Sequence, residues 1–244
     1  MLRDEDRRVL YSGPLAVLVN RYSASASEIF AAAIQDYGRG VIIGERTFGK
    51  GTVQSLKKLS ELRPFSFFGK QPELGEIKLT VAKFYRISGG STQHKGVVPD
   101  IVMPSMIDTT LVGEDTYSSS LPWSTISRSF YRPTAEVSHE EIALLRQKQQ
   151  ERSLKNRMYQ NYLRDLNTLN QIRKKKAVSL QDSAFKSETE RLKQIESQWI
   201  QDPDSTKSQN KDVLLNQPAA VVSDLVELKA TQRHTITRTL PSLN

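Results

Sequence analysis

Three apolar patterns near the start of the chain predict two strands and a helix. Residues 14–20 are almost wholly apolar, as expected of a strand that is covered on both faces. From Ala26 to Tyr37 the apolar positions follow the spacing of an amphipathic helix, and two glycines then end it. Residues 41–43 form a second buried strand. This strand–helix–strand order predicts parallel pairing with a right-handed crossover.

Further along, the apolar positions alternate with polar ones in a way that predicts more strands. Residues 52–56 form a short alternating run, and residues 76–86 form a longer one. The intervening residues 57–75 hold two prolines and two glycines, which favours a loop or a hairpin excursion. An extended segment at residues 96–104 is expected to close this α/β domain.

The second half of the chain has a helical pattern. Residues 105–137 are rich in Ser, Thr and Asp and predict a linker. Ser138 and Glu141 have the spacing of a capping box at the start of a long helical stretch. Further helices are predicted at 179–200 and 221–228, and the polar residues 201–211 are predicted to be disordered. The expected division is a core at 1–104, a linker at 105–137 and a partly disordered helical region at 138–244.

Composition narrows the classes of function. The chain of 244 residues has no cysteine, which excludes disulfides and thiolate metal sites. Its net charge is +8, but basic and aromatic residues do not interleave as in RNA-binding proteins. We therefore interpret the charge as solvated helix surface and expect no nucleic acid, cofactor or metal. The charged start is unlike a signal peptide, and no apolar run is long enough to cross a membrane.

Two residues are candidates for nucleophilic chemistry. Ser25 stands at the predicted helix start, where free N–H groups and the helix dipole favour an oxyanion. Lys50 lies between two glycines after the second buried strand. A serine with a lysine base cleaves acyl bonds without His or Cys, provided that burial keeps the lysine neutral. Both residues also have an ordinary interpretation: Ser25 and Glu28 form a capping box, and Lys50 suits an exposed turn.

Nucleotide binding is an alternative for the same lysine. Residues 44–52 nearly match the phosphate-binding pattern G-x-x-x-x-G-K-[ST]. However, Gly51 stands where the pattern requires Ser or Thr, and the next residues favour a strand over a helix. Because the phosphate binds at the N-terminus of that helix, the alternative is weak.

Several segments in order resemble the tail-specific, or carboxy-terminal processing, serine proteases. They include Ser-Ala-Ser-Ala-Ser-Glu-Ile-Phe from Ser23, Thr-Phe-Gly-Lys-Gly-Thr-Val-Gln from Thr47 and Lys-Phe-Tyr-Arg-Ile-Ser-Gly-Gly from Lys83. The resemblance implies a crotonase-like protease core with a parallel sheet, followed by a mainly α-helical C-terminal domain.

The resemblance also assigns roles to residues. It places the nucleophile on Ser25, the general base on Lys50, the residue that orients the lysine on Gln54, and one oxyanion N–H on Ala26. Asp36 matches an aspartate associated with the family's active site. Eleven residues of helix put it about 16 Å from Ser25 at ~1.5 Å per residue, so we expect Asp36 to fix the helix end or its neighbour Arg39.

The resemblance implies that the protein is an endopeptidase that cleaves proteins at or near their C-termini. Its substrates would be proteins or peptides with unstructured C-termini, an adaptor protein is possible, and the family's location is the periplasm. In the family a glycine-rich oxyanion segment and a PDZ domain precede the nucleophile, but only residues 1–12 precede the first matched strand here. We therefore expect a truncated, weakly active or inactive enzyme. The alternative is a non-catalytic remnant that acts as a protein-binding helical module.

Overall fold

The computed structural model describes residues 5, 6, 8–62, 74–199 and 213–239. The chain divides into two compact units, and each contains segments that are distant in the sequence. The sheet unit comprises Val17–Asp100 and Ile107–Glu136. The helical unit comprises Met1–Ala16, Ile101–Met106 and Val137–Asn244. An α/β part with a parallel sheet is thus followed by a helical region, which confirms the predicted fold class.

The predicted strand–helix–strand order is present in the sheet unit. Strands β1 (Ala16–Val19) and β2 (Val41–Gly44) are neighbours in the sheet, and α1 (Ala26–Asp36) joins them. The apolar side of α1 packs on the strands because its small Ala31 and Ala32 allow close approach. The buried core consists of Val19, Ala31, Ala32, Ile42 and Val97.

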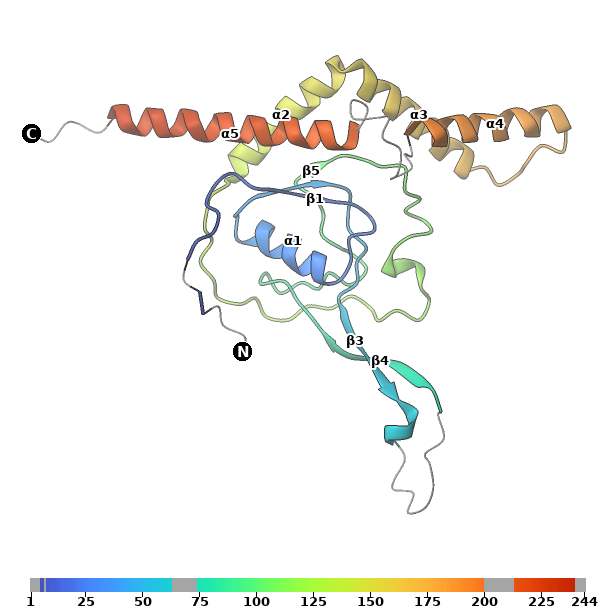
Figure 1. Cartoon of the computed structure of the whole chain (residues 1–244), viewed down its shortest axis with the longest axis horizontal. Helices are drawn as coiled ribbons and strands as arrows, with labels where there is room; N and C mark the ends of the chain where they lie inside the picture. Colours follow the sequence, from blue (N-terminus) through green and yellow to red (C-terminus); the bar gives the residue numbers. More distant parts are fainter. Residues whose placement is uncertain (1–4, 7, 63–73, 200–212, 240–244) are drawn as a thin grey trace, which may run out of the picture. The chain divides into compact units, whose positions relative to one another are not determined.

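A two-stranded antiparallel ribbon extends from this unit (Figure 1). It consists of β3 (Thr52–Lys58) and β4 (Glu76–Lys83), and its pairing runs from Thr52 opposite Lys83 to Lys58 opposite Glu76. The hairpin prediction is therefore confirmed, although most of its connection lies outside the described residues. The register shifts between Val53 and Gln54, as at a β-bulge, which re-aims the side chains near the base of the ribbon.

Most of the predicted linker, residues 107–136, lies in the sheet unit. They include a single turn of 3-10 helix, η2 (Glu114–Thr116). Their contacts with the unit are specific. The Thr134 N–H donates to the Tyr37 carbonyl oxygen at 2.8 Å, and the Tyr131 ring packs edge-on against that of Tyr37.

The helical unit begins as the capping box predicts. The Ser138 Oγ accepts from the Glu141 N–H at 3.2 Å, and a Glu141 carboxylate oxygen accepts from the Ser138 N–H at 2.8 Å. The expected long helical stretch is divided into α2 (His139–Lys155) and α3 (Arg157–Arg173). Asn156 makes the division because its side chain accepts from the Tyr159 N–H and caps the second helix.

Two further helices complete the unit. The predicted helix at 179–200 is α4 (Asp182–Trp199). The last helix, α5 (Val213–Thr239), is much longer than the predicted 221–228, while the segment predicted to be disordered lies outside the described residues. The core of the unit is formed mainly by aromatic and aliphatic side chains of α3, α4 and α5, among them Tyr159, Tyr162, Leu166, Leu169, Ile195 and Val213.

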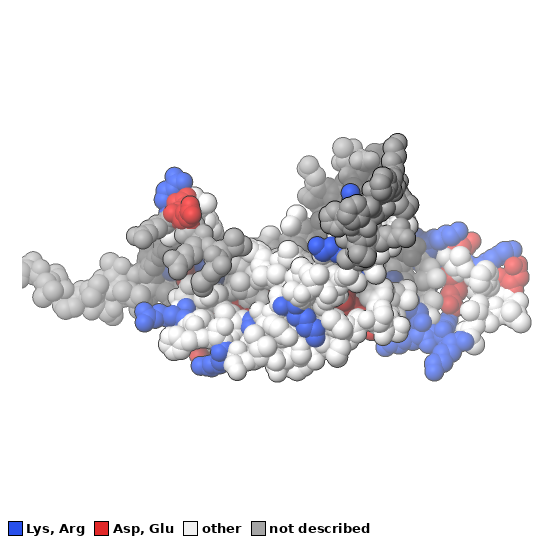
Figure 2. Space-filling view, turned by 90° about the horizontal axis from the view of Figure 1, so that it is seen from below, with Lys and Arg blue, Asp and Glu red and all other residues white. Residues whose placement is uncertain are grey.

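Among the described helices, none has the length and apolar character that crossing a membrane requires. The basic residues are dispersed in the view of Figure 2, where Lys and Arg side chains lie in several separate groups with acidic side chains beside some of them.

Candidate active site

Ser25 has an unusual backbone at the point where β1 gives way to α1. It is the N-cap of α1, with φ of 58° and ψ of −113°, a conformation that L-residues rarely adopt. The serines on either side make local hydrogen bonds: Ser23 Oγ accepts from the Asn20 N–H at 3.1 Å, and Ser27 Oγ donates to the Ala24 carbonyl at 2.8 Å. Of the three serines, Ser25 is thus the one with a strained backbone at a helix N-terminus.

The buried carboxylate of Glu28 joins Ser25 to the loop that carries Lys50. Glu28 Oε2 accepts from the Ser25 N–H and from the Lys50 N–H, both at 2.8 Å. The two amide nitrogens are therefore no more than twice that distance apart. Glu28 Oε1 accepts from the Gly49 N–H at 2.7 Å and from the Thr47 hydroxyl at 2.5 Å. We call residues 47–51 the base loop.

The environment of Glu28 affects its protonation. Its side chain is fully buried, and burial raises its pKa above the usual value. Hydrogen bonds from the Thr47 hydroxyl and from three N–H groups act in the opposite direction, because they stabilise the charged form. The carboxylate therefore remains costly to bury, and its donors offset part of that cost.

Lys50 and Gln54 line the same cavity. The cavity has a volume of about 340 Å³ and lies between the base loop, the ribbon and the segment after η2. Lys50 is half-buried, whereas Gln54 is exposed on β3. The remaining lining residues are Phe48, Thr52, Lys78, Thr80, Glu114, Tyr117, Ser119, Ser120 and Leu121.

The phosphate-binding alternative fails on local structure. Strand β3 begins at Thr52, directly after Lys50 and Gly51, so no helix follows the lysine. A phosphate would lack the helix N-terminus on which that type of site depends.

Asp36 lies at the opposite end of α1 from Ser25, where it pairs with Arg86. Its carboxylate forms two hydrogen bonds with the Arg86 guanidinium, at 2.6 and 3.0 Å. Arg39, the other partner that we considered for Asp36, pairs with Glu136 at 3.1 Å. Asp36 thus attaches the end of α1 to the segment after β4.

Two other groups at the site have no distinctive sequence pattern. Glu28 was visible only as the last residue of a capping box, a pattern that is common at helix starts. Arg21 was not singled out, yet it is completely buried and donates to the Thr47 carbonyl at 2.8 Å and to the Val112 carbonyl at 2.5 Å. A buried arginine requires such partners, but no local pattern identifies them.

Comparison with known proteins relates the sequence of this chain to two family models. Residues 2–103 match the model of peptidase family S41, and residues 107–227 match that of the C-terminal domain of tail specific protease. The tail-specific protease of Haemophilus influenzae is 42% identical over 190 residues, which are 77% of this chain and 27% of the relative. The carboxy-terminal-processing protease of Bartonella bacilliformis is 42% identical over 102 residues, 42% of this chain and 21% of the relative.

A solved structure, the photosystem II D1 C-terminal processing protease, is 39% identical over 41% of this chain and 23% of its own, with a TM-score of 0.31. Residues 2–103 belong to the S41 peptidases, a family of serine-type hydrolases. Its second half matches the domain that characterises the tail-specific branch of these enzymes. The chain spans 27% of the Haemophilus relative, so it corresponds to a part of such an enzyme.

Proposed function

We propose that this chain carries the catalytic dyad of a serine endopeptidase, with Ser25 as the nucleophile and Lys50 as the general base. The observation that supports this most directly is the carboxylate oxygen of Glu28, which accepts from the N–H groups of both residues. A nucleophile and its base must be held close together before the reaction, and a shared anchor does this. The positive φ of Ser25 adds support, because backbone strain gathers at functional sites.

The proposed reaction is amide hydrolysis in two steps. Neutral Lys50 Nζ accepts the proton of the Ser25 hydroxyl as Ser25 Oγ bonds to the substrate carbonyl carbon. The C–N bond breaks, the leaving amine takes the proton, and water then hydrolyses the acyl-enzyme. The Ala26 N–H, in the first residue of α1, would donate one hydrogen bond to the oxyanion.

Two further residues support the dyad in this proposal. Gln54 lines the cavity with Lys50 and would hold the amine in position through its side-chain amide. Asp36 would act at a distance, because its ion pair with Arg86 fixes the far end of the helix that Ser25 begins.

The substrates and the location are part of the proposal. The name of the Haemophilus relative supports action on the tails of proteins. We therefore expect substrates with unstructured C-termini, and action in the periplasm. An adaptor protein could deliver them. Activity of these residues alone would be low if the oxyanion requires a second donor from elsewhere in the enzyme, since loss of one donor costs about 10²–10³ in rate.

A small acylating probe tests the dyad without requiring a protein substrate. The folded chain should be acylated at Ser25, and both Ser25→Ala and Lys50→Ala should abolish the label. Ser23→Ala and Lys57→Ala are matched controls, because Ser23 serves a local turn and Lys57 is exposed on β3; they should label like the wild type. If the folded chain takes no label, the dyad is not competent here, and the alternative of a non-catalytic protein-binding module gains support.

A further inference from the structure

One segment at the cavity comes from outside the residues that match the peptidase model. Residues 112–121 match the C-terminal domain of tail specific protease, not family S41. Their side chains nevertheless provide a side of the cavity that Lys50 and Gln54 line. We call residues 112–121 the wall segment.

Backbone and charged contacts hold the wall segment against the base loop. Arg21 is the main connection: its guanidinium binds the Thr47 carbonyl on the base loop, and also the Val112 carbonyl and the Asp115 carboxylate on the wall segment. The Glu114 N–H adds a direct bond of 3.0 Å to the Phe48 carbonyl.

Gln93 forms a second connection on the other side of Lys50. Its Oε1 accepts from the Gly51 N–H at 2.8 Å, while its Nε2 donates to the Leu121 carbonyl at 2.8 Å and to Glu114 Oε1 at 3.2 Å. Gln93 is fully buried, so these bonds are shielded from water. The base loop is thus fixed to the wall segment on both sides of Lys50.

The side chains of the wall segment, in contrast, remain accessible. Tyr117 is 57% exposed and Leu121 is 41% exposed, although both line the cavity. A fixed backbone with accessible side chains is the arrangement of a binding surface.

We propose that the wall segment forms one side of the substrate subsite next to Lys50, and that it selects peptide segments with an uncharged residue there. This inference rests on the proposed function. The cavity is of a size that suits a short extended stretch of peptide, at the lower end of the usual range of about 300–1,000 Å³. Its hydroxyl groups, from Thr52, Thr80, Ser119 and Ser120, can hydrogen-bond to peptide groups.

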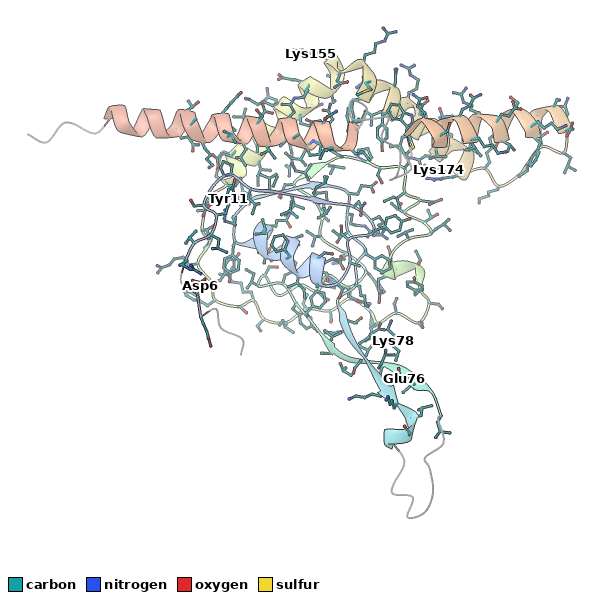
Figure 3. The ribbon with its side chains drawn as sticks, viewed as in Figure 1. Asp6, Tyr11, Glu76, Lys78, Lys155 and Lys174 are labelled. Atoms are coloured by element: carbon teal, nitrogen blue, oxygen red, sulfur yellow. The ribbon has the colours of Figure 1, made fainter. Side chains whose placement is uncertain are left out.

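The charges of the cavity favour an uncharged side chain. When Lys50 is neutral, as a base must be, the formal charges are one cation on Lys78 and one anion on Glu114. Lys78 lies on β4 of the ribbon (Figure 3). A substrate carboxylate at this place would stabilise the ammonium form of Lys50 and so work against catalysis.

Photo-cross-linking tests the subsite without catalysis. The Ser25→Ala chain is incubated with unstructured peptides that carry a photoreactive residue at successive positions, and the cross-linked sites are mapped by mass spectrometry. At least one position should cross-link to residues 114–121. In the wild-type chain, an aspartate beside that position should lower acylation of Ser25 by an activated peptide ester several-fold, because the carboxylate favours the ammonium form of Lys50. Cross-links confined to other parts of the chain, or none, would overturn the inference.

Ser119 and Ser118 provide a matched pair of variants. Both are exposed, but only Ser119 lines the cavity. Ser119→Trp should fill the cavity and reduce cross-linking at least tenfold, while Ser118→Trp should have no effect. Equal yields from the two variants would contradict the inference.

The acylating probe separates this inference from the proposed function. Cross-linking to residues 114–121 without acylation of the wild-type Ser25 would retain the subsite and reject the dyad. Acylation of Ser25 without such cross-links would retain the dyad and reject the subsite.

Discussion

Replacing Glu28 by glutamine tests how the site is held together. The substitution keeps the size of the side chain but turns one acceptor oxygen into an NH₂ donor. If the NH₂ group takes the place of Oε2, it faces the Ser25 and Lys50 N–H groups, and two buried donors lose their acceptor. If it takes the place of Oε1, the Gly49 N–H loses its acceptor, and so does the Thr47 hydroxyl, whose oxygen also accepts from the Val97 N–H at 2.7 Å.

In either orientation at least one buried N–H group loses its acceptor, and this loss sets the magnitude. One buried N–H without an acceptor costs about 1–3 kcal/mol. Removing the buried charge acts in the opposite direction, because burial already raises the pKa of Glu28. We expect the lost hydrogen bonds to outweigh this relief, and the sheet unit of Glu28→Gln to be about 1–3 kcal/mol less stable at neutral pH.

Urea unfolding measures the difference. A Trp199→Phe background leaves Trp123, which belongs to the sheet unit, as the fluorescent reporter. Glu136→Gln is the control, since the half-exposed Glu136–Arg39 pair should contribute no more than about 1 kcal/mol. An unfolding free energy for Glu28→Gln equal to or above that of the wild type would refute the reasoning.

The dependence on pH gives an independent check with a definite sign. Because the folded pKa of Glu28 is raised, its contribution to stability is fully present below the unfolded value of about 4.3 and is lost as pH rises through the folded pKa. The wild type should therefore gain stability relative to Glu28→Gln as the pH is lowered. If the difference in unfolding free energy between the wild type and Glu28→Gln stayed constant as the pH was lowered, the pKa of Glu28 would not be raised in the folded chain.

Three further substitutions have defined outcomes. Burial raises the pKa of Glu141, but the Lys229 ammonium and other donors lower this pKa more, so that the net shift is downward. The helical unit should therefore lose stability as the pH falls through the lowered pKa. Unfolding followed by circular dichroism should show this loss in the wild type and not in Glu141→Gln. Gly44→Ala should cost more than about 1 kcal/mol in urea, because φ is 125° and a Cβ would overlap the Val19 carbonyl. Asn156→Ala should cost about 1 kcal/mol by calorimetry, whereas Asn167→Ala, exposed within α3, should not destabilise.

The parts of the fold that the sequence predicted are those with a local cause. The strand–helix–strand order follows from apolar spacing between residues 14 and 43, and the start of α2 follows from its capping box. The full length of α5 was missed because its apolar pattern is weak outside residues 221–228, and contacts with α2 support it instead.

The candidate site likewise has parts with a local cause in the sequence and parts that depend on long-range contacts. Ser25 and Lys50 could be proposed from their own short motifs, since each has a helix start or a glycine-flanked turn beside it. The partners of Arg21 could not be, because Asp115 is 94 residues away along the chain and nothing in the intervening sequence marks the contact. Residues 107–136 looked like a linker for the same reason: their polar composition is that of a loop, and only long-range contacts show where they pack.

The position of the wall segment also has a consequence for protein synthesis. Gln93 links Gly51 of the base loop to Leu121 of the wall segment. Leu121 is synthesised about seventy residues after Gly51. Until residue 114 has been made, the Phe48 carbonyl lacks the Glu114 N–H from which it accepts in the finished protein. The base loop therefore reaches its final set of hydrogen bonds only after the whole wall segment has been made.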